Sequence, residues 1–378
     1  LRIACRFIPM TRKCLLFLLA LPASLQAAPL FIGTSTGGNS ASKGIYLADF
    51  DSATGKLTKP KLAVEYGNPG FLALHPAKRI LYASGKPNNP FADGSGSVAA
   101  FAIDEDHGLK FLGEASSGGE NACHVAVDAT GNTVAVANYG DGSFSTVRLD
   151  EAGKPAEAGT VIKNKGSGPN QQRQGGPHAH GVYFNKANTL LFMPDLGLDQ
   201  VFVYPFDAAA SKLGEPLASL VSAPGAGPRH MAFSPDEKNA YVLNEIDNSV
   251  TASSHVDGKF KVLGSLPTLP EDFSGGNTTA EIEVHPNGKF VYASNRGHHS
   301  IVVYQRDGDT GELKFLQHAP CGGEVPRHFK IDPTGEWLLC AHQASNTISV
   351  LSLDPVTGLL GEPANTIAAP SPTCLLFD

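Results

Sequence analysis

Apolar and polar residues alternate along this chain in short runs that are separated by Gly, Pro, Asn and Asp. In the clearest stretch the alternation covers residues 281–284, 290–293, 300–305 and 314–316. β-Branched and aromatic residues that alternate with polar ones predict strands, and the residues between the runs are typical of turns. No part of the chain shows a sustained helical period. The pattern therefore predicts an all-β protein built from four-stranded units.

An Asp that ends a predicted strand and begins a turn recurs with a period of about 50 residues, which is typical of solenoids and propellers. The copies are separated by 46 to 57 residues, and they are Asp51, Asp104, Asp150, Asp207, Asp257, Asp307 and Asp354. Seven copies of an antiparallel four-stranded unit predict a seven-bladed β-propeller.

The two ends of the chain each hold part of one unit. Before Asp51 there is room for two strands, at 30–34 and 44–50. After the last repeat a fourth strand is expected near 364–368, and residues 372–377 then resemble the start of another unit. We expect this C-terminal run to pair with the N-terminal blade and close the ring, since an open sheet edge invites association. Residues 28–378 are thus predicted to form one propeller domain.

Composition agrees with a turn-rich globular chain and argues against one class of partner. Apolar residues make up 42% of the sequence and charged residues 17%, with 41 Gly and 27 Pro. The formal net charge is −7, and a negative surface argues against nucleic-acid binding. No C-x-x-C pair follows residue 28, so a zinc site of that spacing is not expected, and we expect the thiols there to be mostly buried and unpaired.

The N-terminal residues have the pattern of a secretory signal. Arg12 and Lys13 precede an apolar run at 15–21, and small residues follow at 23–28. A basic start, a short apolar stretch and a small-residue cleavage region are the three parts of such a signal. We therefore interpret residues 1–27 as an N-terminal extension plus signal peptide, and we expect an exported protein, periplasmic or secreted, with no membrane attachment after cleavage.

Polar residues gather where inner strands are predicted to start and second strands to end. Adjacent strands are antiparallel, so these positions lie at the same mouth of the central channel, where a ligand site is expected. The candidates are His124, His178, His180, Arg229, His230, Glu281, Arg327 and His328 at strand starts, and Asn138, Asp195, Glu245, Arg296 and Gln343 at strand ends.

Some of these candidates also have a structural interpretation. His124, His230 and His328 occupy one repeat position, so contacts between blades would explain them equally well. Asn138 and Asp195 could hydrogen-bond turn backbone. Five other candidates depart from the repeat, and this departure favours a functional over a structural role. They are His178, His180, Arg229, Glu245 and Arg296.

Several segments resemble the lactonase family of seven-bladed propellers, which includes propeller-type 6-phosphogluconolactonases and a fungal carboxymuconate cyclase. They include GSGPNQQRQGGPHAHGV at 166–182, PGAGPRHMAFSPD at 224–236, YVLNEIDNSV at 241–250 and NTTAEIEVHPNGKFVYASNRGHHSI at 277–301. The resemblance implies a catalytic set of His180, Arg229, Glu245 and Arg296, because these match the His, Glu and two Arg proposed for the fungal cyclase. The remaining candidates are expected to bind substrate.

The resemblance implies hydrolysis of a sugar-type lactone, a small-molecule substrate. Either Glu245 or His180 could activate the water, and Arg229 and Arg296 could hold the carbonyl oxygen or an anionic group. No G-x-S-x-G or H-E-x-x-H motif and no carboxylate-rich metal cluster is present, so we expect a site without a metal or other cofactor. A calcium-dependent lactonase with ligands from Glu245, Asn244 and Asn295 is left open as an alternative. A cyclase that interconverts muconate-type acids and lactones, or a non-catalytic ligand-binding propeller, are the alternatives, and protein partners stay open.

Overall fold

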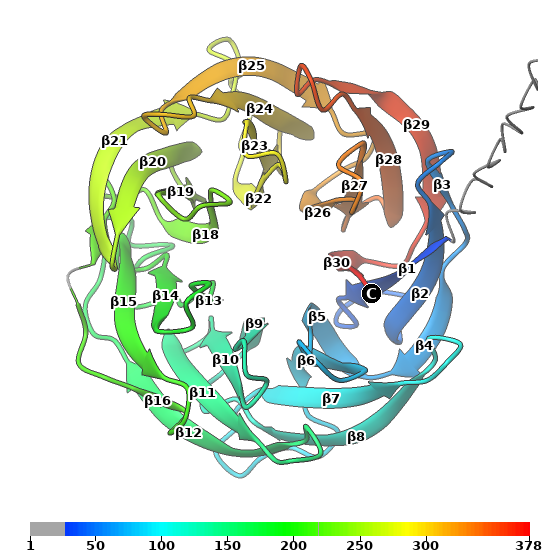
Figure 1. Ribbon diagram of the computed structural model, residues 1–378, viewed down its shortest axis with the longest axis vertical. Coiled ribbons are helices and arrows are strands. Elements are labelled where there is room, and N and C mark those ends of the chain that lie inside the picture. Colours follow the sequence, from blue (N-terminus) through cyan, green and yellow to red (C-terminus); the bar gives the residue numbers. More distant parts are fainter. Residues whose placement is uncertain (1–26, 218) are drawn as a thin grey trace, which may run out of the picture.

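Seven antiparallel sheets surround a central channel in the computed structural model, which describes residues 27–217 and 219–378 (Figure 1). The predicted signal peptide falls almost entirely on residues outside this description. The all-β propeller expected from the repeat is confirmed, with four strands as the basic unit of each blade. Among the described residues there is no helix, so none that could cross a membrane.

Each blade consists of strands that follow one another from the channel outward. Blade one is β30 (Pro372–Phe377), β1 (Ala28–Thr34), β2 (Gly44–Asp51) and β3 (Lys56–Leu57), with β4 (Lys61–Glu65) also on β2. Blade two is β5 (Gly67–Leu74), β6 (Ile80–Lys86), β7 (Ser97–Ile103) and β8 (Leu109–Ser116). Blade three is β9 (Ala122–Val127), β10 (Thr133–Asn138), β11 (Ser143–Leu149) and β12 (Pro155–Lys163). Blade four is β13 (Tyr183–Phe184), β14 (Leu190–Asp195), β15 (Gln200–Asp207) and β16 (Lys212–Leu213), with β17 (Leu220–Val221) also on β15. Blade five is β18 (Pro228–Phe233), β19 (Asn239–Asn244), β20 (Ser249–Val256) and β21 (Lys259–Pro267). Blade six is β22 (Thr279–Val284), β23 (Phe290–Asn295), β24 (Ser300–Arg306) and β25 (Leu313–Pro320). Blade seven is β26 (Pro326–Ile331), β27 (Trp337–His342), β28 (Thr347–Leu353) and β29 (Leu360–Ala368).

The C-terminal strand closes the ring, as the sequence predicted. β30 pairs antiparallel with β1, with Leu30 opposite Phe377 and Ile32 opposite Leu375. It is the inner strand of blade one, next to the channel (Figure 1). Blade one therefore has an inner strand like the other six blades, and the edge of β1 is paired.

In six of the seven blades the side chain of the repeated Asp accepts hydrogen bonds that shape the turn between the third and fourth strands. Asp150 Oδ1, for example, accepts hydrogen bonds from the backbone N–H groups of Ala152 and Lys154 at 2.9 and 2.8 Å. The same turn also joins neighbouring blades. The hydroxyl of Tyr82 on β6 donates to the Gly153 carbonyl oxygen in the turn of the next blade at 2.7 Å. This satisfies a buried phenol and fixes how one blade lies against the next.

The core lies between blades, because each second strand is covered on both faces. Every residue of β10, β19 and β23 is buried, and these strands are rich in Val, Ala, Tyr and Asn. Such strands are continuous apolar runs rather than clean alternations. The Asn that ends each of the three marks the point where the chain reaches the channel mouth.

Candidate active site

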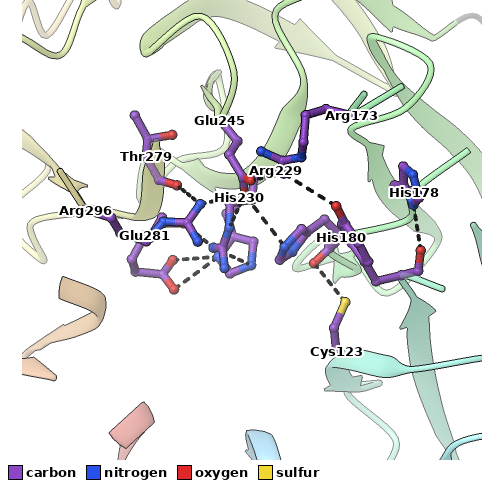
Figure 2. A network of polar contacts seen from close by, with 12 residues as sticks. Cys123, Arg173, His178, His180, Arg229, His230, Glu245, Thr279, Glu281 and Arg296 are labelled. Atoms are coloured by element: carbon purple, nitrogen blue, oxygen red, sulfur yellow. Dashed lines mark hydrogen bonds and ion pairs between the residues drawn. The ribbon is translucent and has the colours of Figure 1, made fainter. Parts of the chain in front are cut away.

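Four of the side chains singled out in the sequence meet at one mouth of the channel. His180 lies just before β13, Arg229 lies in β18, and Glu245 and Arg296 directly follow β19 and β23. Figure 2 shows them turned toward one another from three neighbouring blades. Inner strands begin where second strands end, so the ring geometry brings these distant segments together.

Glu245 is the centre of this group and is only 3% exposed. Its Oε2 lies 3.0 Å from Arg229 Nε and 2.9 Å from Arg296 Nη2, and Arg173 Nη2 binds its Oε1. Burial alone would raise the pKa of Glu245, but the three guanidiniums outweigh it and lower this pKa to about 2. The carboxylate is therefore ionised and both its oxygens are engaged. It is better placed to hold guanidiniums than to accept a proton.

The two arginines of the family motif differ in what they can reach. Arg229 is 2% exposed; its Nη1 donates to the Ala280 carbonyl oxygen and lies 3.1 Å from His230 Nε2. Arg296 Nη2 donates to the Thr279 carbonyl oxygen at 2.8 Å, and its side chain is 15% exposed and lines the cavity described below. Arg229 thus supports the carboxylate from behind, whereas Arg296 is open to a ligand.

His180 offers a neutral imidazole beside these charges. Its backbone N–H donates to the Pro194 carbonyl oxygen at 3.0 Å, which anchors the segment. The ring Nε2 is 3.9 Å from Glu245 Oε2, and Nδ1 has no hydrogen-bond partner among residues 27–217 and 219–378. Burial, followed by the charge of Arg229, lowers the pKa of His180 well below its ordinary value. A lone pair on this ring is therefore free to take a proton.

A cavity of about 240 Å³ opens in front of these groups, and we call it the mouth cavity. It is lined by Asn121, Cys123, Tyr139, Arg173, His180, Glu245, Arg296 and Arg327. A second hollow of about 130 Å³ adjoins it, sharing Arg327 and adding Gln343. The Arg327 guanidinium has no hydrogen bond or ion pair within the described residues. Burial, followed by Arg229 and Arg296, lowers the pKa of Arg327 to about 10, so it remains charged at pH 7.

Sequence reasoning missed Arg173, which lies in the segment between β12 and β13. Its Nη2 lies 3.4 Å from the Tyr139 hydroxyl as well as binding Glu245. The Tyr139 ring in turn stacks on His178 at a centroid separation of 4.6 Å, and His178 Nδ1 lies 2.9 Å from the Tyr139 carbonyl oxygen. A signal was present, because Arg173 stands alone among Gln and Gly just before PHAHG. The segment lies outside the strand ends, however, and strand geometry predicts nothing about it.

The three histidines that share a repeat position form a layer beneath the mouth cavity. The Phe71 ring lies 3.8 Å from His124, 5.9 Å from His230 and 5.6 Å from His328 by ring centroids. Glu281 lies 3.1 Å from His230 Nδ1 and 3.3 Å from His328 Nε2. Burial lowers the pKa of all three imidazoles, to about 3 for His328. This layer supports the site from below and does not line it.

Asn138 and Asp195 hold backbone and do not line the mouth cavity. Asn138 Nδ2 donates to the Ser117 carbonyl oxygen at 3.0 Å. Asp195 Oδ1 accepts from the backbone N–H groups of His178 and Gly197 at 2.8 and 3.0 Å. Burial raises the pKa of Asp195 to about 6. These contacts agree with the structural interpretation of both residues.

The mouth cavity is suited to an anion rather than to a metal cation. Three guanidiniums and one carboxylate line it, and that carboxylate already binds two of the guanidiniums, those of Arg173 and Arg296. Among the described residues, the lining of the mouth cavity does not include three His, Cys, Asp or Glu side chains within metal-binding distance of one another. The arrangement can bind an anionic group, polarise a carbonyl and move a proton through His180.

Comparison with known proteins agrees with this geometry. A family model described as Lactonase, 7-bladed beta-propeller, matches residues 29–377. The chain belongs to this family. The 6-phosphogluconolactonase of Bacillus subtilis is 35% identical over 351 residues, 92% of this chain and 97% of that protein. The 6-phosphogluconolactonase of Formosa agariphila is 34% identical over 336 residues, 88% of this chain and 94% of that protein.

A solved structure of a gluconolactonase has the same fold as this chain. The periplasmic gluconolactonase of Pseudomonas aeruginosa superimposes on this Lactonase-family chain with a TM-score of 0.85 and 28% identity, covering 93% of this chain and 98% of that one. The recognition of the family and the propeller fold are thereby confirmed. The relatives also support a lactonase-type hydrolase acting on a small lactone.

Proposed function

We propose that this chain hydrolyses a sugar-type lactone in the mouth cavity, with His180 as the general base and acid. The observation that carries the proposal is a neutral imidazole, whose Nδ1 has no hydrogen-bond partner among the described residues, beside guanidiniums that a single carboxylate holds in place. Lactone hydrolysis needs a group that takes a proton from water and donors for the oxygen that becomes negative. Both kinds of group line this one cavity.

The proposed reaction has two steps. Water attacks the lactone carbonyl carbon while His180 takes its proton, and Arg296 and Arg173 stabilise the negative carbonyl oxygen. The ring C–O bond then breaks, and the imidazolium of His180 returns the proton to the leaving alkoxide. Burial favours this second transfer, because the low pKa of His180 makes its imidazolium a strong acid. The product is an open-chain hydroxy acid.

Glu245 has a positioning role in this proposal. Guanidiniums bind both of its oxygens, so neither oxygen is free to take a proton from water. Glu245 fixes Arg173 and Arg296 at the cavity wall. Of the two bases that the sequence left open, this geometry favours His180.

Arg327 is proposed to bind the anionic end of the ligand. It is the guanidinium of the cavity wall that has no partner within the described residues. The anion could be a phosphate on the substrate or the carboxylate formed in the product, since Arg binds either in a planar, two-point contact. The names of relatives include both phosphogluconolactonases and a gluconolactonase, so both substrates belong in the test.

The experiment is a hydrolysis assay of the purified protein with gluconolactone and its 6-phosphate, in the presence of a chelator. We expect turnover of at least one of them. His180→Asn should lower kcat by about 10²-fold or more. Because the pKa of His180 is depressed, the base form persists below pH 6.5, and kcat/KM should not fall until the pH is lower than that.

His285→Gln is the matched control, because this histidine lies in a turn at the opposite face and contacts the Gly335 carbonyl oxygen at 2.9 Å. It should leave kcat unchanged. An equal loss of kcat in His180→Asn and His285→Gln would contradict the proposed site. Lactone formation from a muconate-type diacid, without hydrolysis of either lactone, would instead favour the cyclase.

We also propose that the chain is exported. The basic, apolar and small-residue segments before Pro29 support this, as does the periplasmic gluconolactonase among its structural relatives. Mass spectrometry of the native protein should find a mature N-terminus at Ala28 or Pro29. Retention of residues 10–27 in a cytoplasmic fraction would contradict export.

A further inference from the structure

A group of metal-ligating side chains lies where blades six and seven meet, and its members do not line the mouth cavity. Cys321 follows β25, Cys340 lies in β27, and His342 ends β27. All three are buried, and their ligating atoms lie within 4.8 Å of one another. Of the residues that the structure describes, this is the single cluster of three His, Cys, Asp or Glu side chains with such spacing.

Ser349 determines which nitrogen of His342 faces the thiols. The Ser349 hydroxyl donates its one proton to the Cys321 carbonyl oxygen at 2.5 Å. It can therefore only accept from His342 Nε2, which lies 2.9 Å away. This places the imidazole proton on Nε2 and leaves a free lone pair on Nδ1, 3.8 Å from Cys321 Sγ. Metal-bound histidines are oriented in the same way by a partner on their other nitrogen.

The loop after β25 is shaped around the His342 ring. A Cβ added to Gly323 would lie 2.5 Å from His342 Cγ, so a glycine is required at this close approach. Gly322 has a φ of +83°, which also favours glycine. Cys321 Sγ lies 2.9 Å from the His299 carbonyl oxygen, which is an oxygen donor beside the three side chains. The ring and the thiol are thus held in place before any ligand arrives.

We propose that Cys321, Cys340 and His342 bind a zinc ion that links blade seven to blade six. Tetrahedral zinc, with bonds of about 2.3 Å to sulfur and about 2.0 Å to nitrogen, holds such ligand atoms about 3.5–3.8 Å apart. The separation of Cys321 Sγ and His342 Nδ1 has this value. Both thiols lose their protons on binding, and the zinc ion takes their place. The site is independent of the lactonase proposal, because its side chains contact none of the proposed catalytic groups.

The test uses the full protein, purified under reducing conditions, with cobalt and zinc as probes. Cobalt should give a thiolate-to-metal charge-transfer band and the intense visible bands of a tetrahedral ion, and zinc should displace it. Cys340→Ser should abolish these bands. Ser349→Ala keeps all three ligands and should weaken zinc binding by about 10–100-fold. Cys374→Ser removes a buried thiol outside the cluster and is the matched control.

Circular dichroism and melting temperature confirm that the variants are folded, so a lost band reports lost ligation. Bands that survive in Cys340→Ser, or that disappear equally in Cys374→Ser, would overturn the assignment. So would a wild-type protein that binds neither probe. A Cys321–Cys340 cross-link found by non-reducing mass spectrometry of the native protein would also overturn it, because the thiols would then form a disulfide.

Discussion

The channel has a cavity at each end, and the two differ in how their charges are balanced. The mouth cavity is about 240 Å³, whereas the cavity at the opposite end, which we call the far cavity, is about 410 Å³. In the far cavity Glu283 is paired with Lys330, and the Glu281 carboxylate lies beside His230 and His328. In the mouth cavity three guanidiniums face one carboxylate. The far cavity therefore has no excess of positive charge, whereas the mouth cavity does.

The layer of rings between the two cavities keeps them chemically separate. Phe71, His124 and His328 line the far cavity and none of them lines the mouth cavity. Burial lowers the pKa of the histidines, so this layer is neutral at pH 7. Excess positive charge is thus confined to one end of the channel, where it strengthens attraction for an anion.

The largest expected effect comes from removing β30, which lines the hollow beside the mouth cavity through Thr373 and the far cavity through Leu376. Deletion of residues 372–378 exposes the edge of β1 and should leave the protein insoluble or much less stable. Solubility and melting temperature provide the measurement. A truncated protein that melts like the full chain would show that ring closure is not needed.

Glu245→Gln in the mouth cavity should come next, compared with Glu283→Gln in the far cavity. Loss of the Glu245 charge leaves buried guanidiniums without a counter-charge, which should cost about 3–5 kcal/mol of stability. It should also lower kcat by about 10²-fold. Glu283→Gln can still accept hydrogen bonds from Lys330 and the Ile331 N–H, so kcat should be unchanged.

The pH profile of Glu245→Gln separates two roles. A positioning role lowers kcat/KM without moving its acid limb, whereas loss of a general base removes that limb. Equal kinetic losses in the Glu245 and Glu283 variants would contradict the contrast between the two cavities.

Arg327→Met should affect binding more than turnover. If Arg327 holds a substrate phosphate, KM for the phosphorylated lactone should rise about 10–100-fold while KM for the unphosphorylated lactone changes little, because one strong anion contact is lost. Lys330→Met in the far cavity is the control and should leave both KM values unchanged. Steady-state kinetics with both lactones measure this, and an unchanged KM for both would remove Arg327 from the binding site.

The smallest effect concerns Asp195. Its pKa is raised in the folded protein, whereas the pKa of Glu245 is lowered. Its pKa of about 6 in the folded protein lies above the ordinary value of 3.8. Between pH 4 and pH 6 the Asp195 carboxyl is therefore protonated more often in the folded protein than in the unfolded chain. Stability from this group therefore falls as the pH rises from about 4 to 6, by about 1–2 kcal/mol. Asp195→Asn should remove this fall, as measured by urea unfolding at pH 4 and pH 7. For Glu245 the sign reverses, since its stabilisation is lost as the pH falls from 4.5 toward 2.

Much of the site could be anticipated from strand geometry and from departures from the repeat. His180, Arg229, Glu245 and Arg296 could be placed at one mouth because strand starts and ends alternate around a ring. The sequence could not predict that the two arginines differ in position. Arg229 lies behind the carboxylate, whereas Arg296 lies in the cavity wall. Side-chain direction depends on packing between blades, which the repeat does not encode. Arg173 shows the same limit, since a segment outside the strands carries no periodicity.

The sequence by itself determined the seven-bladed ring, its four-stranded units and its closure by residues 372–377, because these follow from local periodicity and turn residues that each unit repeats. The tertiary structure alone decided which groups face which. It brought Arg173 onto Glu245 from another blade, left Arg327 without a partner among the described residues, and gathered Cys321, Cys340 and His342 at one junction. The physical reason is that charge pairing, burial and metal-ligand distances are properties of contacts between segments far apart in the chain. No local pattern records such contacts.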